Sequence, residues 1–183
     1  MRPEMKNIKQ NLKKGNLRAA SEAILTAKKQ NKNYPELIVL EGIFYGQAGE
    51  LERALEAFAV ALKKLPRDPI LYYNLACVLR ATGRLPAAEE AIRKSLHFMP
   101  LNSLALFELA HIQTFQGKHN EAIMTLLKCI KNTTYFFPAY VAIARYFLLD
   151  NHLELAIKLF ESAAKEDPQE QFFKDQLREL KGL

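Results

Sequence analysis

The side chains best suited to metal or thiol chemistry in this 183-residue chain are four histidines and two cysteines. They are His97, His111, His119, His152, Cys77 and Cys129. Imidazole and thiolate groups bind zinc when several of them recur at short, fixed spacings, and no such spacing is present. His111 and Cys77 stand at equivalent places 34 residues apart, but two ligands do not make a metal site. We therefore expect no metal site and no cofactor, with both cysteines filling space in a reducing compartment.

Motifs for nucleophilic or phosphate chemistry are missing from the sequence as well. There is no Gly-rich phosphate loop and no Gly-x-Ser-x-Gly elbow. Carboxylates such as Glu89 and Glu90 stand in stretches of alternating charge, which is typical of solvated helix surfaces. The sequence thus offers no catalytic residues, and we predict that the protein is not an enzyme.

The net charge of +6 is concentrated at one end of the chain. Residues 1–34 carry nine Lys or Arg against two Glu, whereas residues 35–183 carry seventeen basic and eighteen acidic residues. The basic residues of interest are Lys6, Lys9, Lys13, Lys14, Arg18, Lys28, Lys29 and Lys32. Either they solvate the end of the molecule, or they form a patch for an acidic protein or an anionic surface such as a membrane. Nucleic acid is not expected, because no aromatic residue is interleaved with them before Tyr34.

Targeting signals are not evident either. No stretch approaches the roughly 18 consecutive apolar residues that cross a bilayer. The first residues are basic but lack the apolar run and cleavage site of a secretory signal. We expect a soluble, cytoplasmic protein.

The elements that position these residues follow from a strict internal repeat. Gly15, Gly49, Gly83 and Gly117 are each 34 residues apart, and Asn151 completes the series. Asparagine is the residue that best replaces glycine in a left-handed turn. Five residues after each of these comes an alanine: Ala20, Ala54, Ala88, Ala122 and Ala156. Seven residues further on stand the small residues Ala27, Ala61, Ser95, Cys129 and Ala163.

Apolar residues recur at helical spacing on both sides of each glycine. The glycine ends a first helix and supplies the turn, small residues let two antiparallel helices approach, and bulky residues fill the space beside them. Prolines such as Pro66 and Pro100 stop the second helix, whereas Pro86 falls in the first turn of one, where proline is tolerated. The pattern predicts an all-α chain of helix–turn–helix units.

These features resemble the tetratricopeptide repeat (TPR) family, whose unit is a 34-residue helix–turn–helix. The clearest copy contains Tyr72, Leu75, Ala76, Leu79, Gly83, Leu85, Ala88, Ile92, Ser95 and Pro100. The resemblance implies a right-handed superhelix, or α-solenoid, of about five repeats. The expected single domain over residues 1–183 comprises repeats 1–34 (degenerate and basic), 35–68, 69–102, 103–136 and 137–170, with a capping helix at 171–183.

The end repeats differ from the others in ways that suggest capping. In the first repeat Met5, Ile8 and Leu12 are left to pack, and the final segment places Phe173 on the apolar face of an amphipathic helix. We expect the solenoid to end at that helix. Glu41 stands where later repeats are apolar, so it needs a partner, for which Lys13 or Lys14 are candidates.

The resemblance also implies a binding surface, because first helices line the concave side of such a superhelix. The residues expected to line this groove are Val39, Ile43, Ile70, Tyr73, Asn74, Cys77, Arg80, Leu104, Phe107, His111, Val141 and Arg145. The Lys, Asn and Arg clamp with which some members hold a chaperone carboxylate is matched by Asn74 alone.

Most of the expected groove residues are apolar, and a contiguous apolar patch usually marks a binding site. We predict an adaptor or chaperone-like scaffold that binds a peptide or helix of a partner protein. One alternative is that the curvature of the chain or the terminal helix buries the stripe. Another is a structural, self-assembling protein that forms homo-oligomers through the groove or the end repeats.

Overall fold

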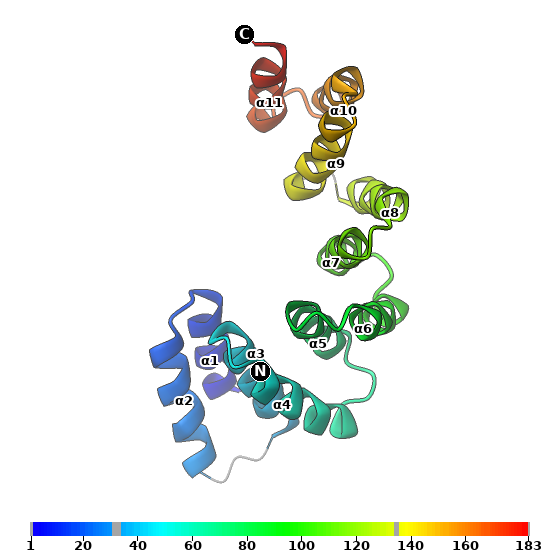
Figure 1. The fold of residues 1–183 in the computed structure, drawn as a ribbon. Coiled ribbons are helices and arrows are strands. Elements are labelled where there is room, and N and C mark those ends of the chain that lie inside the picture. Colours follow the sequence, from blue (N-terminus) through cyan, green and yellow to red (C-terminus); the bar gives the residue numbers. More distant parts are fainter. Residues whose placement is uncertain (1, 31–33, 134–135, 183) are drawn as a thin grey trace. The chain divides into compact units, whose positions relative to one another are not determined.

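The computed structural model describes residues 2–30, 34–133 and 136–182, and over these ranges its regular secondary structure consists of α-helices joined by short turns (Figure 1). The helices are α1 (Pro3–Lys13), α2 (Leu17–Lys29), α3 (Pro35–Gln47), α4 (Leu51–Lys64), α5 (Pro69–Ala81), α6 (Leu85–Phe98), α7 (Ser103–Phe115), α8 (His119–Asn132), α9 (Phe137–Leu149), α10 (Leu153–Glu166) and α11 (Gln171–Lys181). The chain divides into two compact units, Met1–Pro100 and Leu101–Leu183, each considered by itself. The expected single domain over residues 1–183 stays a prediction.

The turn inside each helix pair is the same closed loop. The four repeat glycines have positive φ angles, from 69° at Gly15 to 80° at Gly49, and Asn151 adopts the same conformation with φ 59°. The residue that follows the turn residue donates a backbone hydrogen bond to the carbonyl five residues earlier in the chain. In the third repeat, for example, Arg84 N–H donates to the Leu79 carbonyl at 2.9 Å. The prediction that Asn151 takes the place of a glycine is therefore confirmed.

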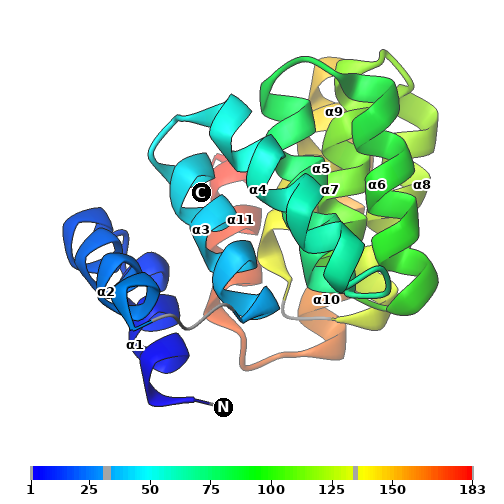
Figure 2. The same cartoon turned by 90° about the horizontal axis from the view of Figure 1, so that it is seen from below.

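Unit 1 comprises α1 to α6, with α1 lying beside α2 and α5 beside α6 (Figure 2). As predicted, Met5, Ile8 and Leu12 pack α1 into a core, together with residues of α2 and α3. A second core surrounds Phe58 of α4, which is fully buried. The small residues of the repeat are buried too, and Ser95 donates a hydrogen bond from its hydroxyl to the Pro69 carbonyl at 2.8 Å.

Close helix contact in unit 1 depends on one glycine inside α3. A Cβ atom on Gly42 would lie 2.5 Å from the Phe58 ring, so any larger residue would collide with that ring. Glycine in a helix interior costs about 1 kcal/mol relative to alanine. Here that cost is offset by the approach of α3 to the buried aromatic ring.

Glu41 finds a different partner from the one expected. Its carboxylate accepts a hydrogen bond from Lys28 at 2.6 Å, not from Lys13 or Lys14, and another from the Tyr45 hydroxyl at 3.2 Å. Lys28 lies near the end of α2, which packs against α3. The partner is therefore set by the packing of the two helices and not by sequence distance.

Unit 2 comprises α7 to α11, with α7 paired with α8 and α9 with α10. Helix α11 packs against α10 and inserts Phe173, which is fully buried, next to Tyr140 and Phe160. This is the face that the amphipathic pattern predicted to pack. The aromatic ring of Phe172, the preceding residue, stacks instead on Phe137 of α9.

Candidate partner-binding site

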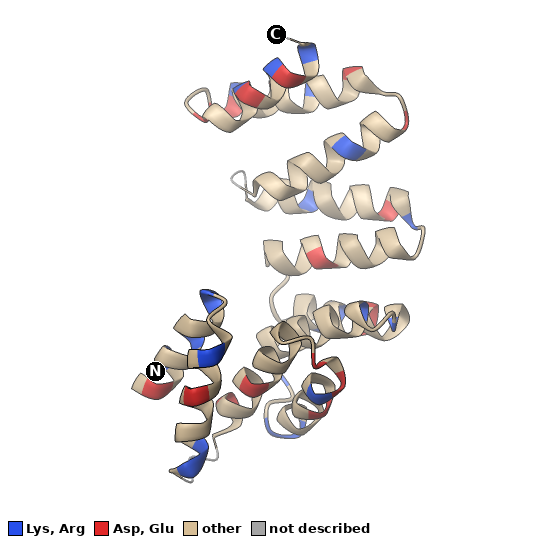
Figure 3. Cartoon of the chain, turned by 60° about the vertical axis from the view of Figure 1, so that its left-hand side comes forward, with Lys and Arg blue, Asp and Glu red and all other residues tan. Residues whose placement is uncertain are grey.

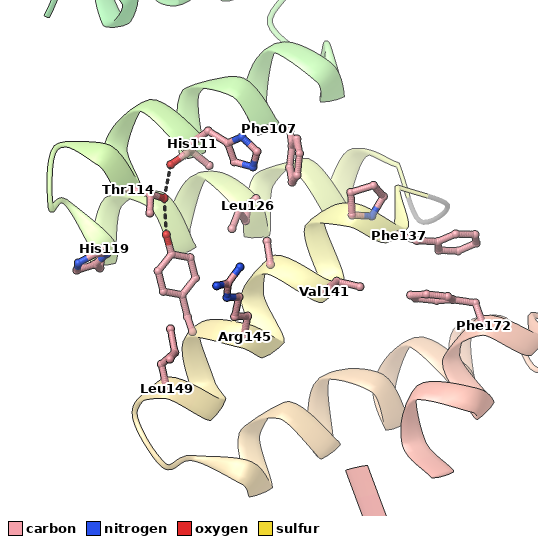
Figure 4. A pocket seen from close by; sticks show the side chains of 14 residues that line it. Phe107, His111, Thr114, His119, Leu126, Phe137, Val141, Arg145, Leu149 and Phe172 are labelled. Carbon is pink, nitrogen blue, oxygen red and sulfur yellow. Dashed lines mark hydrogen bonds between the residues drawn. The ribbon is translucent and has the colours of Figure 1, made fainter. Parts of the chain in front are cut away.

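A large cavity lies between α7 and α9 of unit 2 (Figure 4). It has a volume of about 800 Å³ and is lined mainly by apolar side chains. Of the predicted groove residues, Phe107, His111, Val141 and Arg145 line it. Sites that enclose a ligand typically have volumes of roughly 300–1,000 Å³. This α7–α9 cavity is therefore large enough to receive several side chains.

Helical periodicity brings the lining residues to one face of each helix. Phe107, His111 and Thr114 follow one another along α7 at intervals of four and three residues. Val141 and Arg145 are four residues apart on α9, so they face the same side. Figure 4 shows the side chains of α7 and α9 extending into the space between the two helices.

Large side chains close both ends of the cavity. At one end the Phe107 ring packs edge-on against Phe136, with 5.3 Å between centroids, and lies 4.3 Å from His111. At the other end the hydroxyls of Thr114 on α7 and Tyr146 on α9 share a hydrogen bond, shown dashed in Figure 4. These contacts link α7 to α9 on either side of the space between the two helices.

The terminal helix supplies part of the wall. Phe172 of α11 lines the cavity and stacks on Phe137 of α9, with 4.5 Å between ring centroids. Helix α11 therefore does more than cover the apolar end of the last repeat. It also extends the apolar lining beyond the first helices of the repeats.

The cavity lining contains one arginine and no acidic residue. Arg145 is the only charged residue in the sequence of α9, and the cavity lining includes no Asp or Glu. Among the described residues, none forms a hydrogen bond or an ion pair with Arg145. The cavity thus combines apolar walls with one guanidinium whose N–H groups remain available.

Several lining residues were not predicted from the sequence. These are Ala110, His119, Leu126, Phe137, Pro138, Tyr146, Leu149 and Phe172. One signal was present at Phe136, the N-cap of α9, which makes no side-chain cap. Of the corresponding residues, Asp68 and Asn102 cap their helices, whereas Tyr34, the N-cap of α3, does not. At Phe136 the aromatic ring instead contacts Phe107, which lines the cavity.

Leu104, the remaining predicted groove residue of unit 2, is 54% exposed and does not line the cavity. In unit 1, Ile43, Asn74 and Cys77 line a pocket of about 220 Å³ between α3 and α5, here called the α3–α5 pocket. The amide of Asn74 donates a hydrogen bond within its own helix, to the Ile70 carbonyl at 2.7 Å.

The other predicted residues of unit 1 lie outside the α3–α5 pocket. Ile70 is 56% exposed, and Tyr73 and Arg80 are half-buried. Val39 is only 6% exposed and packs in the core around Phe58. The prediction that Val39 lines the groove is therefore wrong, because this core, which includes residues of α5, covers its side chain.

The two cysteines are both free thiols. Cys129 is buried in unit 2, and its burial raises the pKa of its thiol, so it stays protonated at neutral pH. Within the described ranges, no group of three or more His, Cys, Asp or Glu is arranged to hold a metal ion. None of the described helices combines the length and apolar character needed to cross a membrane.

The basic end of the chain presents its charges to solvent. Lys6, Lys9 and Lys13 are exposed along α1, and basic segments appear on both α1 and α2 in Figure 3. On α2, Lys28 is paired with Glu41, and Arg18 lies 3.4 Å from Glu22. Lys14 and Lys29 are also exposed, whereas Lys32 lies outside the described residues.

Two family models, each described as a tetratricopeptide repeat, match residues 39–98 and 104–133 of the chain. No curated protein matches its sequence. The second range contains α8 and all of α7 except Ser103, and these two helices supply one side of the cavity.

Several solved structures share the fold. A crystal structure of MamA is 21% identical, with a TM-score of 0.72 over 92% of this chain and 96% of that one. TTC0263, a thermophilic TPR protein of Thermus thermophilus, is 17% identical, with a TM-score of 0.73 over 98% of both chains. A chain of the APC/C hetero-tetramer Cut9–Hcn1 is 19% identical, with a TM-score of 0.73 over 94% of this chain and 35% of that chain.

Proposed function

The chain belongs to the tetratricopeptide repeat family, and from that premise we propose that it is a protein-interaction module that receives a segment of a partner protein in the α7–α9 cavity. The family is an all-α scaffold family, and a general role in protein–protein interaction follows from membership. The proposal is more specific, since it assigns the binding to unit 2. It also treats the protein as a scaffold without catalytic activity.

One observation supports this proposal above the others, namely the apolar lining of a cavity of about 800 Å³. Val141 is 43% exposed and Leu149 is 72% exposed, so apolar surface faces solvent at its rim. Covering this surface with a partner's apolar side chains removes it from water, which is favourable by about 25 cal/mol per Å². A chain of related fold that takes part in the APC/C hetero-tetramer Cut9–Hcn1 is consistent with such a role.

The test is affinity purification from cells with three forms of the full chain as bait. Val141→Glu places a carboxylate in the cavity wall, whereas Met124→Glu changes a residue of α8 that is 60% exposed and does not line the cavity. We expect Val141→Glu to reduce capture of specific partners about tenfold or more, because a charge is costly in an apolar interface. Met124→Glu should leave capture unchanged, and equal capture by all three forms would refute the proposal.

The same experiment separates the proposal from self-assembly. If the protein captured by the wild-type chain is the chain itself, and sedimentation at micromolar concentration shows an oligomer that Val141→Glu dissociates, the occupant is a second copy. A monomer that still captures other proteins excludes this alternative. The cytoplasmic location is a separate prediction, which fractionation of cells would check.

For the basic residues of α1 and α2 we propose contact with an acidic protein or an anionic surface. The exposed stripe of Lys6, Lys9 and Lys13 supports this, because the three residues share one side of α1. Replacing all three by Gln should abolish salt-sensitive binding to vesicles of anionic lipid or to an acidic partner. Binding that persists in this variant would leave solvation as the role of the stripe.

A further inference from the structure

Arg145 stands out within the α7–α9 cavity. The residues at the same place in the three preceding repeats are Ile43, Cys77 and His111, so the repeat architecture does not require an arginine there. In Figure 4 the Arg145 side chain extends from α9 toward α7. An arginine that packing does not require is best explained by a role in recognition.

The surroundings of Arg145 define what it can bind. A guanidinium offers five N–H donors in a fixed fork that matches the two oxygens of a carboxylate. No carboxylate of the protein lies among the residues that line this cavity. The nearest residues on its own face of α9 are Val141 and Leu149, both apolar.

An occupant that is entirely apolar would take Arg145 out of water without giving it a partner, which is unfavourable. A basic occupant would add repulsion between like charges. An occupant with a negative group beside an apolar one avoids both costs, because the apolar group fills the space between α7 and α9 while the negative group pairs with the guanidinium.

Resting on the function proposed above, we infer that the partner segment carries a carboxylate next to a large apolar side chain. The carboxylate pairs with Arg145, and the apolar side chain packs between Phe107 of α7 and Val141 of α9. The cavity thus recognises a partner segment in which an acidic residue lies beside an aromatic residue or a leucine. This specificity belongs to unit 2, because the α3–α5 pocket has Cys77 in place of Arg145.

The test is selection from a random displayed-peptide library on the full chain. Peptides selected by the wild-type protein should share a large apolar residue beside Asp or Glu. On Arg145→Glu the acidic residue should be replaced by Lys or Arg at the same place in the motif. The control Lys158→Glu makes the same charge reversal on α10, away from the cavity, and should select the acidic motif.

A synthetic peptide from the selection then quantifies the pairing. Changing its Asp to Asn should weaken binding to the wild-type chain about fivefold, the upper range for an exposed ion pair. The same change should have no effect on Arg145→Gln, because the partner charge is already absent. A motif without an acidic residue, or an equal loss on both proteins, would overturn the inference.

The two proposals fail in different ways. If no peptide is selected, or if selected peptides bind Val141→Glu as well as the wild type, the cavity is not the binding site and the proposed function itself is wrong. If Val141→Glu abolishes binding but the Asp-to-Asn change has no effect, the cavity binds its partner through apolar contacts alone. Only the carboxylate inference is then refuted.

Discussion

The α3–α5 pocket of unit 1 and the α7–α9 cavity of unit 2 occupy the same place in the repeat, yet their volumes are about 220 and about 800 Å³. Adding two repeats, or 68 residues, to a pocket residue gives its counterpart in the cavity. The pairs are Ile43 and His111, Gly46 and Thr114, Leu51 and His119, Phe58 and Leu126, Asn74 and Ala142, Cys77 and Arg145, Val78 and Tyr146, and Ala81 and Leu149.

Three substitutions between the units bear on the difference in volume, and two of them form one contacting pair. In unit 1, Gly46 has no side chain, and a Cβ placed on it would lie 3.2 Å from Val78, so α3 and α5 approach closely there. In unit 2 the equivalent pair is Thr114 and Tyr146, which are bulkier and hydrogen-bonded to each other. At the floor, the Phe58 ring is replaced by the smaller Leu126, which leaves more space above it.

The comparison shows that fold and site depend on different positions of the same repeat. The left-handed turn residues (glycine, or asparagine at position 151) and the small buried residues are kept in both units, and they define the helix pairs. The residues between neighbouring first helices vary, and they decide whether a cavity forms and what charge it carries. Function therefore lies in the variable positions that the fold tolerates.

The largest expected effect concerns the two floor residues. Phe58→Ala removes a fully buried ring and should lower the free energy of unfolding by about 3–5 kcal/mol. Leu126→Ala should cost less, about 2 kcal/mol, because a leucine side chain has fewer buried atoms to lose than a phenylalanine ring and borders the larger of the two spaces. Urea denaturation followed by far-UV circular dichroism measures both. If both variants lost the same free energy of unfolding, the side chains at the floor of the pocket and of the cavity would be packed equally well.

A smaller effect is expected from closing the space that Gly42 leaves. Gly42→Ala should destabilise the protein by about 1–3 kcal/mol through overpacking against Phe58, although alanine is the better helix former. In a Phe58→Leu background the penalty should shrink, since unit 2 already combines Ala110 with Leu126 at these positions. A double-mutant cycle by urea denaturation measures this coupling, and additive effects would contradict the close contact.

The N-cap residues of α5 and α9 can also be compared, because an N-cap typically contributes about 1 kcal/mol to stability. Asp68 accepts hydrogen bonds from the Ile70 and Leu71 amides at 2.8 and 3.1 Å, so Asp68→Ala should cost about 1 kcal/mol. Phe136→Asp gains such a cap on α9 but loses the contact with Phe107. Its net change in thermal stability should be smaller than that of Asp68→Ala. A large loss would show that the Phe136 ring matters mainly for folding.

The smallest effect should come from the hydroxyl that joins α7 and α9. Tyr146→Phe removes its hydrogen bond to Thr114 and should cost about 0.5–1 kcal/mol. The matched control is Tyr72→Phe, whose hydroxyl donates to the Pro66 carbonyl at an exposed site, where water can replace the bond. Thermal unfolding of both variants gives the comparison. A loss no larger than the control's would mean that Tyr146 separates the helices through its size alone.

Much of the fold could be predicted because a 34-residue period repeats information that is local to each unit. The turn residues, the buried small residues and the packing face of the first helix follow from spacing along the chain, and Asn151 confirms that a turn can be identified without glycine. The partner of Glu41 could not be predicted in this way. It depends on how α2 lies against α3, which brings Lys28 within 2.6 Å.

The sequence by itself therefore determined the helices, their turns and the basic end, since each follows from residue types at a fixed spacing. Only the tertiary structure decided that Val39 is buried, that Phe172 of α11 joins the lining, and that α7 and α9 leave a cavity between them. The physical reason is that a space between helices depends on the combined volumes of side chains from several repeats. No single repeat carries that information.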